Sequence, residues 1–433
     1  MQTASKKVIN GWAMYDWANS VYNLVITTTF FPIYFTTITR SDATGNNVTF
    51  FGRTFVNSAL YDYSMAAAFI LAALLSPILS SIADTRGNKK RYLMMFTWLG
   101  GLSCCALYNF KGPDPSVEYG AIFFILATLG YCGGLVFYNS YLPEIATIED
   151  RDRVSAKGFA MGYIGSVLLQ LIGFALVVVK PFGIDGGMPV RITFLLTGLW
   201  WIGFAQITFL RLPASKATVQ QHSASALTEG FQEIRKVFAQ VKVMPVLKRF
   251  LRGFFFYSMG VQTVMMAATI FGSQELGLPA DKLIMAVVAI QVVAVLGAWG
   301  IAKLSGKFGN LPVLMCVVVL WVAICLAGYR MQTATDFYLL AVAVGLVMGG
   351  VQSLSRSTYA KLMPETDDTA SFFSYYDVVE KLSVAIGLIT FGYIHELTGS
   401  MRNSVLALIA FFVIGLLWLF SALKKQKSLA AKS

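Results

Sequence analysis

Four polar side chains recur along the first long apolar stretch of the chain, residues 12–38. They are Asp16, Asn19, Asn23 and Thr27. Their spacing of three and four residues would place them on one face of an α-helix. Lipid cannot solvate such a face, and a lone carboxylate in a bilayer costs at least about 2.5–3.5 kcal/mol. We therefore expect the face to meet other helices or a watery path.

Such a polar face could bind a solute or a proton. Asn19 and Asn23 lie deeper in the stretch and are the better candidates for binding a solute. Asp16 lies close to one end of the stretch. It fits a structural or gating carboxylate, paired with a neighbouring helix, as well as it fits a proton or substrate site.

Later apolar stretches contain further polar groups. A single buried amide usually bonds a neighbouring helix, at about 0.6 kcal/mol. Several amides facing one cavity would instead form a neutral hydrogen-bonding site for a polar solute. The candidate amides are Gln170, Gln262, Gln291 and Gln352.

Charged residues also lie within the apolar stretches near the end of the chain. Asp377 and Lys381 are four residues apart, so they can form an ion pair within one helix. That pairing leaves Glu380 or a solute carboxylate for Arg356, because an arginine inside a membrane span needs an anionic partner. We include Arg356, Asp377 and Lys381 among the candidate substrate or coupling residues.

The composition indicates a multi-pass, all-α membrane protein. The 433 residues are 56% hydrophobic and only 13% charged, and the mean hydropathy is +0.65. Soluble chains carry about 25% charged residues. The net charge of +12 could suggest a nucleic-acid partner. The basic residues instead cluster in alternate loops, as membrane topology requires, so no such partner is expected.

Enzymatic and metal-binding patterns are missing from the sequence. The chain has two histidines and five cysteines, and the cysteines all lie in apolar stretches. No metal spacing, nucleophile elbow or phosphate-binding loop occurs. We therefore predict no enzymatic activity, no cofactor and no metal.

Twelve apolar stretches are long enough to cross a bilayer, which takes about 20 residues. Lys and Arg favour the side of the N-terminus by about three to one, which predicts that both termini are cytoplasmic. The predicted spans are 11–38, 57–82, 91–110, 119–142, 158–180, 191–211, 248–274, 282–304, 311–330, 337–361, 371–395 and 402–423.

An internal repeat divides the spans six and six. Asp84-Thr-Arg-Gly87 aligns with Gly306-Lys-Phe-Gly309, 222 residues later, and Leu142-Pro-Glu144 aligns with Met363-Pro-Glu365, 221 residues later. We predict an N-terminal half at 1–211 and a C-terminal half at 248–433. The linker at 212–247 contains apolar residues at helical spacing, which predicts an amphipathic cytoplasmic helix.

Two loops are candidates for a cytoplasmic gate. The loop Ser80-Ser-Ile-Ala-Asp84-Thr-Arg86-Gly87-Asn-Lys89-Lys90-Arg91 resembles the signature between helices 2 and 3 of the major facilitator superfamily. In that family the loop locks the inner gate through carboxylate–arginine contacts, which implies the role for Asp84, Arg86 and Gly87. After span 4, Glu144 is the expected partner of the basic residues that begin at Arg151. A solvated basic turn that only obeys topology is the alternative.

Five segments carry a closer resemblance. They are Gly11-Trp-Ala-Met-Tyr-Asp16-Trp-Ala-Asn19-Ser20, Tyr141-Leu-Pro-Glu-Ile-Ala146, Gly158-Phe-Ala-Met-Gly-Tyr163, Gly260-Val-Gln262-Thr263 and Gln352-Ser-Leu-Ser-Arg356-Ser357. They are similar to the vacuole-effluxer family, a branch of the major facilitator superfamily whose fungal member exports amino acids from vacuoles. One departure is Met259, where that family often has aspartate. The short loops resemble a bacterial member.

The resemblance implies a monomeric secondary transporter in the cell membrane. It would move a small polar solute, an amino acid or related metabolite first, by alternating access between the halves. Spans 1 and 7 would line the site, surrounded by lipid, and proton coupling and direction stay open. The alternative from another class is a non-transporting sensor or lipid-interacting scaffold on the same fold.

Overall fold

The computed structural model describes residues 2–41, 45–86, 88–112, 117–179, 183, 187–214, 226–278, 280–398 and 400–431. Gly87 lies outside the described residues, as does the side chain of Arg86, so the predicted gate roles of both stay predictions.

The first part of the chain forms the following elements. They are α1 (Lys6–Val21), η1 (Tyr22–Phe30), α2 (Phe31–Ile38), β1 (Asn47–Phe50), β2 (Arg53–Val56), α3 (Asn57–Arg86), α4 (Lys89–Ala106), η2 (Leu107–Asn109), α5 (Val117–Ser140), α6 (Leu142–Ile145), α7 (Arg151–Val179) and α8 (Met188–Arg211). The second part is helical throughout its described residues. Its helices are α9 (Ala226–Val243), α10 (Pro245–Leu276), α11 (Ala280–Phe308), α12 (Asn310–Arg330), α13 (Ala334–Leu362), α14 (Thr369–Thr398) and α15 (Met401–Ala430).

The helices agree with the predicted all-α membrane architecture. Ten stretches of the described residues are long and apolar enough to cross a membrane, and α4 and α10 complete the twelve predicted spans. The repeat recurs in the helix ends, since α3 and α11 end 222 residues apart, and so do α5 and α13. The addition to the all-helical prediction is an antiparallel hairpin of β1 and β2 in the loop between α2 and α3.

The described chain forms two compact units. The N-terminal unit comprises Ser5–Tyr138 and Met161–Ala226. The C-terminal unit comprises Leu227–Ser433 together with Met1–Ala4 and Asn139–Ala160. The short segment Asn139–Ala160, which joins α5 to α7, therefore belongs with helices far away in the sequence. The boundaries of the predicted halves and linker stay predictions.

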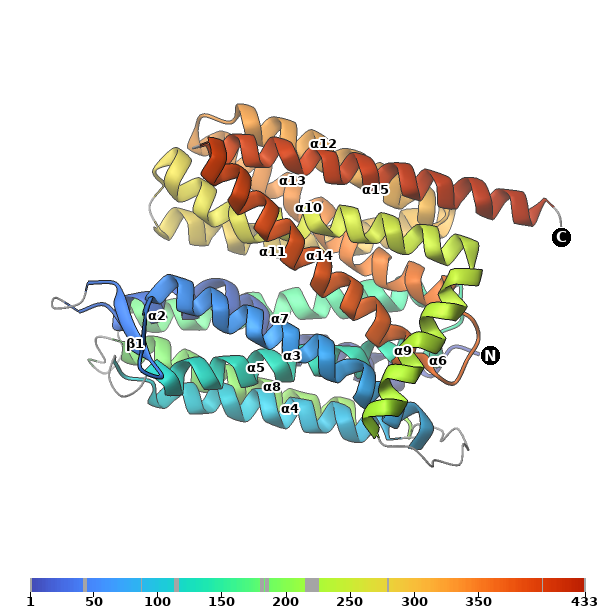
Figure 1. Cartoon of the computed structure of the whole chain (residues 1–433), viewed down its shortest axis with the longest axis horizontal. Helices are drawn as coiled ribbons and strands as arrows, with labels where there is room; N and C mark the ends of the chain where they lie inside the picture. Colours follow the sequence, from blue (N-terminus) through green and yellow to red (C-terminus); the bar gives the residue numbers. More distant parts are fainter. Residues whose placement is uncertain are drawn as a thin grey trace. The chain divides into compact units, whose positions relative to one another are not determined.

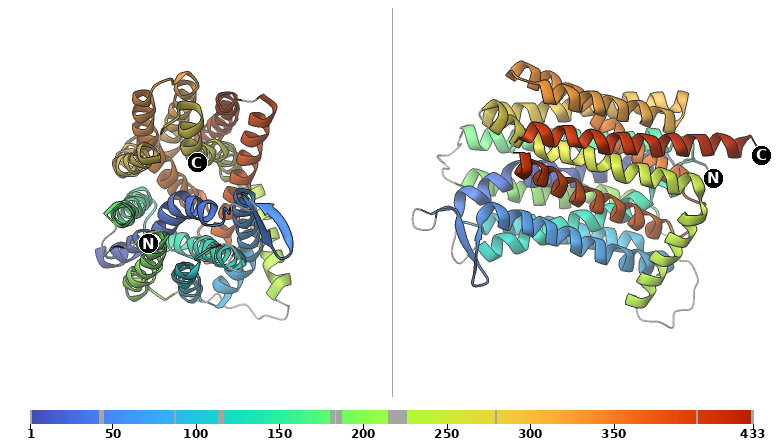
Figure 2. Two further views of the ribbon diagram at one scale, coloured as in Figure 1. Left: turned by 90° about the vertical axis from the view of Figure 1, so that its left-hand side faces the viewer. Right: turned by 45° about the horizontal axis from the view of Figure 1, so that its top comes forward.

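Close helix packing fixes each unit. In the N-terminal unit α4 lies beside α8, and in the C-terminal unit α12 lies beside α15 (Figure 1). Figure 2 shows the helices of each unit nearly end on. Glycines permit the tightest contact: a Cβ added to Gly297 on α11 would lie 2.1 Å from the carbonyl oxygen of Leu346 on α13. Small residues at membrane helix contacts allow this close approach.

Helix ends in the C-terminal unit have specific stop and start signals. Gly277 ends α10 with φ 59°, a left-handed conformation that favours glycine. Thr333 and Asp336 begin α13 with a capping box, in which each side chain accepts a hydrogen bond from the other residue's backbone N–H. The capping box fixes where α13 starts.

Span 1 changes its helical form half-way along. The α-helix α1 gives way at Tyr22 to the π-helix η1, and Pro32 stands at the start of α2. Proline has no N–H and its ring clashes with the carbonyl four residues earlier, so it disturbs the α-helical hydrogen bonds before it. The α-helical spacing that aligned Asp16 with Asn23 and Thr27 therefore does not hold beyond Val21. The prediction of one continuous polar face from Asp16 to Thr27 stays a prediction.

Candidate functional site

Asp16 is clamped to α5 by aromatic residues. The Tyr138 hydroxyl donates a hydrogen bond of 2.7 Å to its carboxylate. The ring of Trp12 stacks on Tyr138 with 4.4 Å between centroids, and the Trp12 indole N–H donates to the Tyr138 carbonyl at 2.9 Å. The Trp-Ala-Met-Tyr-Asp string thus joins α1 to the end of α5. Whether the buried carboxylate has a structural role or binds protons or solute stays a prediction.

Asn19 differs from Asp16 in having no such clamp. The residue is fully buried in the N-terminal unit. Neither its side-chain oxygen nor its nitrogen has a hydrogen-bond partner among the described residues. A buried polar group left unsatisfied costs about 1–3 kcal/mol, so such a group calls for an explanation. Asn23, by contrast, is only partly buried.

The other predicted amides have several kinds of surroundings. Gln170 donates to the Thr29 hydroxyl at 3.0 Å, which joins α7 to η1. Gln352 points at the sulfur of Met265 at 3.7 Å. Gln291 is buried within α11. A shared cavity for all four amides stays a prediction.

Arg356 binds neutral oxygens of the segment Asn139–Ala160. Its Nε donates to the Ser155 hydroxyl at 2.9 Å, and Nη2 donates to the Ser155 carbonyl at 2.8 Å. Nη1 donates to the Asn139 side-chain oxygen at 3.2 Å, and the guanidinium stacks 4.2 Å from the centre of the Phe159 ring. The Arg356 guanidinium of α13 therefore holds the segment Asn139–Ala160, which joins α5 to α7.

A second buried network lies in the same unit around Asp152. Its carboxylate accepts hydrogen bonds from Ser305 and Asn310, each at 2.8 Å. Lys361 makes an ion pair with it at 2.6 Å and also donates to Asn310 at 3.0 Å. Residues of the α11–α12 turn and of the end of α13 therefore all bind the Asp152 carboxylate of α7.

Glu144 and Arg151 each have partners beyond the predicted charge pair. Glu144 accepts a hydrogen bond of 2.7 Å from the Thr369 hydroxyl at the start of α14. Arg151 donates to the carbonyls of Pro143, Ala146 and Ala360. Ala360 lies in the last turn of α13, where a cation stabilises the helix dipole. Both residues thus hold Asn139–Ala160 against α13 and α14.

The predicted gate loop of the N-terminal unit contains a closed ion pair. Asp84 at the end of α3 binds Lys89 at the start of α4 at 2.9 Å, and both side chains are almost fully buried. Lys89 was not among the predicted gate residues, and the predicted gate role of Arg86 stays a prediction. The pair closes the α3–α4 turn.

The charged group on α14 contains the predicted ion pair. Lys381 lies 3.1 Å from Asp377, which confirms the pairing within one helix. Glu380 lies 4.0 Å from Lys381 and accepts a hydrogen bond of 3.4 Å from Gln262 of α10. These residues therefore form one polar cluster between α10 and α14.

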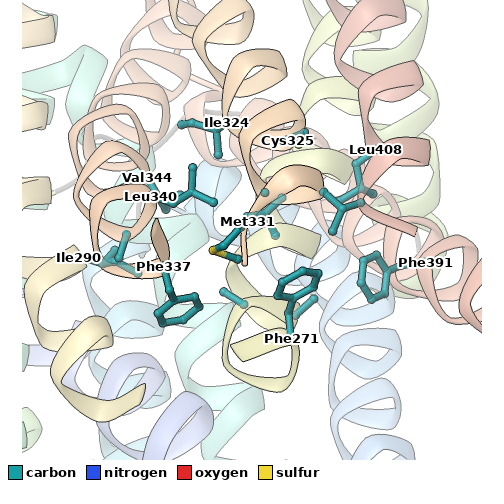
Figure 3. Close-up of a pocket in the computed structure, with 16 residues that line it drawn as sticks. Phe271, Ile290, Ile324, Cys325, Met331, Phe337, Leu340, Val344, Phe391 and Leu408 are labelled. Atoms are coloured by element: carbon teal, nitrogen blue, oxygen red, sulfur yellow. The ribbon is translucent and has the colours of Figure 1, made fainter. Parts of the chain in front are cut away.

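An apolar cavity of about 80 Å³ lies elsewhere in the C-terminal unit (Figure 3). Phe271, Met331, Phe337 and Phe391 surround it in the view. Its lining offers no charged group to orient a polar molecule. It is therefore poorly suited to a polar solute.

Comparison with known proteins decides the family. The sequence profile described as "Vacuole effluxer Atg22 like" matches residues 4–432. The chain is 30% identical over 410 residues to an uncharacterized MFS-type transporter, YxiO, of Bacillus subtilis, covering 94% of this chain and 92% of that protein. The chain belongs to the Atg22-like vacuole effluxer family. Autophagy-related protein 22 of Eremothecium gossypii is 24% identical, covering 98% of this chain and 92% of its own length.

Solved structures confirm the fold of this Atg22-like chain. The human organic anion transporter MFSD10 matches with a TM-score of 0.70 at 13% identity, covering 95% of this chain and 98% of that one. The Escherichia coli fucose:proton symporter FucP matches with a TM-score of 0.67 at 13% identity, covering 96% and 97%. These structures show the major facilitator fold, and the family model and the Bacillus relative identify the chain as a multi-pass membrane protein and an MFS secondary transporter rather than an enzyme.

Sequence reasoning missed several residues that the Atg22-like chain uses. Ser155, Asp152 and Asn310 hold Asn139–Ala160 in the C-terminal unit. Tyr138 holds Asp16. Asp152 carried a usable signal, since it is the lone acid between Arg151 and Arg153 at a helix start. Ser155 and Tyr138 carried none, because serine and tyrosine are common in membrane helices.

Proposed function

We propose that this transporter moves a small polar solute, an amino acid or related metabolite, by alternating access. It works as a monomer in the lipid of the cell membrane with both termini in the cytoplasm, as the bias of Lys and Arg predicts. The effluxer family of its relatives favours export. Nucleic acid has no part in this function.

The observation that carries the proposal is the buried amide of Asn19. An amide offers two donors and an acceptor, and in this state the described residues satisfy neither polar atom. A polar solute with hydroxyl, amino or carboxyl groups can pair with both. Substrate sites of transporters lie near the membrane midplane, where unmet hydrogen bonds are most costly.

The inner gate of the proposed cycle is the segment Asn139–Ala160. Arg356 and Arg151 hold it through neutral oxygens, and Asp152 holds it through hydrogen bonds and one ion pair. Neutral acceptors are cheaper to leave than carboxylates, since hydrogen bonds between protein groups contribute only about 1 kcal/mol net. The proposed opening motion breaks these contacts and lets the solute pass.

The test is transport by purified protein in liposomes. Vesicles loaded with a mixture of labelled amino acids should lose label faster with the protein than without it, measured at two external pH values. A flux that changes with a pH gradient would establish proton coupling. Absence of flux for every amino acid and related metabolite, under any gradient, would contradict the proposal and favour a sensor on this fold.

The variant Asn19→Leu distinguishes a role of Asn19 in binding solute from a role in stabilising the fold. The substitution removes the unsatisfied amide, so the melting temperature should stay equal or rise. Flux should nonetheless fall at least about tenfold if Asn19 binds solute. Gln206→Leu is the matched control, because that amide is already satisfied by the Ile202 carbonyl of its own helix. Normal flux in Asn19→Leu would remove this residue from the site.

A further inference from the structure

Basic side chains gather where α10 begins and α15 ends. The two helices lie side by side in the C-terminal unit. Nε of Arg249 on α10 donates to the Ser421 hydroxyl on α15 at 3.1 Å, which holds these two helix ends together. The members of this α10–α15 basic patch are Lys248, Arg249, Arg252, Lys424 and Lys425.

The patch has no acidic side chain of its own helices to balance it. α15 contains neither aspartate nor glutamate. The one acid of α10 is Glu275, near the other end of that helix, where it pairs with Arg402. None of the five basic side chains forms an ion pair within the part of the chain that the structure describes. The patch therefore has positive charge that an anion from outside the chain can neutralise.

The two arginines of the patch are positioned but keep N–H donors for a ligand. The exposed Arg252 lies over the Trp418 ring, with its guanidinium carbon 4.6 Å from the ring centre, and donates no hydrogen bond to a described residue. Arg249 uses Nε for Ser421 and Nη1 for the Pro245 carbonyl at 2.9 Å, which leaves the two N–H groups of Nη2. Arginine N–H groups match the oxygens of a phosphate group.

One exposed face of α15 changes from apolar to basic at the patch. Val413, Leu417 and Phe420 are 41%, 63% and 56% exposed, and Lys424 is exposed one turn further on. These positions follow each other at three and four residues, so they share one face of the helix. Trp418, which supports Arg252, lies at the same level, and tryptophan is enriched where lipid meets water.

This order of apolar and basic side chains matches one class of anion. Inorganic phosphate or a soluble phosphate ester would use the basic patch and leave the apolar face of α15 unused. A phospholipid carries its phosphate directly next to its acyl chains, and basic side chains beside a membrane span attract anionic headgroups. A phospholipid with a net negative charge therefore matches both parts of the surface.

We propose that the α10–α15 basic patch binds the headgroup of an anionic phospholipid. Arg252 and Lys424 donate to the phosphate oxygens, and Arg249 donates through Nη2. An acyl chain of the same lipid lies along Leu417 and Phe420. The lipid fixes the paired ends of α10 and α15 at the membrane surface. The inference does not depend on which solute is transported.

The test measures lipid stabilisation of the full-length purified protein in micelles of a neutral detergent. Anionic phosphatidylglycerol and zwitterionic phosphatidylcholine with the same acyl chains are titrated at fixed salt concentration. Phosphatidylglycerol should raise the melting temperature with a measurable half-saturating mole fraction, and phosphatidylcholine should not. Glycerophosphate and inorganic phosphate, which offer the anion without acyl chains, should leave the melting temperature unchanged.

Variants assign the effect to the patch. Each basic residue near an anionic membrane surface contributes about fivefold in affinity. Arg252→Gln combined with Lys424→Gln should therefore raise the half-saturating fraction of phosphatidylglycerol at least about tenfold. Lys424→Gln alone should raise it about fivefold. This single variant removes no hydrogen bond or ion pair of the described residues, so it tests the site even if the double variant is unstable.

The matched control removes the same charge from another helix end of the same unit. Lys303 and Lys307 lie at the end of α11, and each lies over an aromatic ring of its own helix. They lack the second helix and the arginines of the patch. Lys303→Gln combined with Lys307→Gln should keep the wild-type half-saturating fraction.

Three results would overturn the lipid site. Equal stabilisation by phosphatidylglycerol and phosphatidylcholine would show that the headgroup charge does not matter. Stabilisation by glycerophosphate or inorganic phosphate equal to that by phosphatidylglycerol would identify a site for free phosphate instead. Equal loss of affinity in the two double variants would show that the lipid responds only to the total charge of the protein.

Discussion

The two hairpin turns that the repeat makes equivalent are held in opposite ways. In the N-terminal unit, the α3–α4 turn neutralises its own carboxylate, since Asp84 binds Lys89 within the turn. In the C-terminal unit, the α11–α12 turn has glycine at the matching position and supplies Ser305 and Asn310 to Asp152 of α7. One turn closes on itself, and the other holds a distant segment.

The difference between the two turns suggests that one contributes to stability and the other to conformational switching. A buried ion pair within one turn forms and breaks only with the turn itself. A carboxylate held by three residues from three other parts of the chain can be released when those parts move. We therefore expect changes in the first turn to affect folding and changes in the second to affect transport. The first two predictions below test this contrast, and the others test how the segment Asn139–Ala160 is held.

The largest effect is expected for Asp84→Asn. It leaves the Lys89 ammonium buried without its counter-charge, and breaking a buried ion pair costs about 3–5 kcal/mol. The melting temperature in detergent should fall strongly. Asp84→Asn combined with Lys89→Met should recover most of it, because no uncompensated charge remains. A stable Asp84→Asn protein that has lost only flux would assign the pair to switching instead.

Asp152→Asn should cost less stability and more transport. Lys361 is partly exposed, so water compensates some of its charge, and we expect a loss of about 2–3 kcal/mol. Asparagine keeps hydrogen-bonding atoms for Ser305 and Asn310. Flux, measured in liposomes at equal amounts of folded protein, should fall by about tenfold or more. Normal flux per folded protein would contradict the expectation that contacts of the α11–α12 turn matter for transport.

The sequence predicted the helices well because burial in lipid imposes a simple pattern. Span positions follow from apolar length, and the repeat follows from matched turns such as Gly306-Lys-Phe-Gly309. The Asp377–Lys381 pair was predictable because spacing within one helix fixes it. The fold family followed from strings such as Tyr-Asp16-Trp-Ala-Asn19.

Contacts across long sequence separations were not predictable. An anionic partner was predicted for Arg356, but its hydrogen bonds to the neutral oxygens of Ser155 and Asn139 were not. The sequence around Ser155 contains no pattern that predicts a hydrogen bond with Arg356. The π-helix of span 1 was not predicted either, and its weak signal lay in Pro32 and the preceding threonines.

Ser155→Ala should weaken the gate with little effect on stability. It removes the hydroxyl that accepts from Arg356 and donates to the Ser353 carbonyl at 2.8 Å, but leaves the Ser155 carbonyl in place. The expected loss is about 1 kcal/mol, with a several-fold change in flux. Ser103→Ala is the matched control, since that buried hydroxyl donates within its own helix to Leu99. Identical flux changes in both variants would contradict the gate role.

The smallest effect concerns the N-terminus, which the same segment holds. The hydroxyl of Thr3 and the guanidinium of Arg153 donate to Asp150 and lower the pKa of its carboxyl below the usual 3.8. The stabilisation is therefore complete above pH 3.8 and is lost as the pH falls through the lower folded value. The backbone N–H of Ala4 donates a hydrogen bond to the Ile145 carbonyl. Its hydrogen exchange therefore reports on whether the N-terminus is held.

Hydrogen exchange of the Ala4 amide measures this effect. After correction for the intrinsic rate, protection should decline on acidification below the usual carboxyl pKa in the wild-type protein. In Asp150→Asn, protection should be low at all pH values. Equal protection in the two proteins at neutral pH would show that the carboxylate does not hold the N-terminus.

The most direct measurement locks the gate segment to α13. Ser155→Cys and Ser353→Cys, introduced after replacing the five native cysteines, put one thiol on each of the two residues that the hydrogen bond from Ser155 Oγ to the Ser353 carbonyl joins. Oxidation should abolish flux in liposomes, and reduction should restore it, while each single variant is unaffected by either treatment. Undiminished flux with the disulfide formed would contradict a cycle in which Asn139–Ala160 must leave α13.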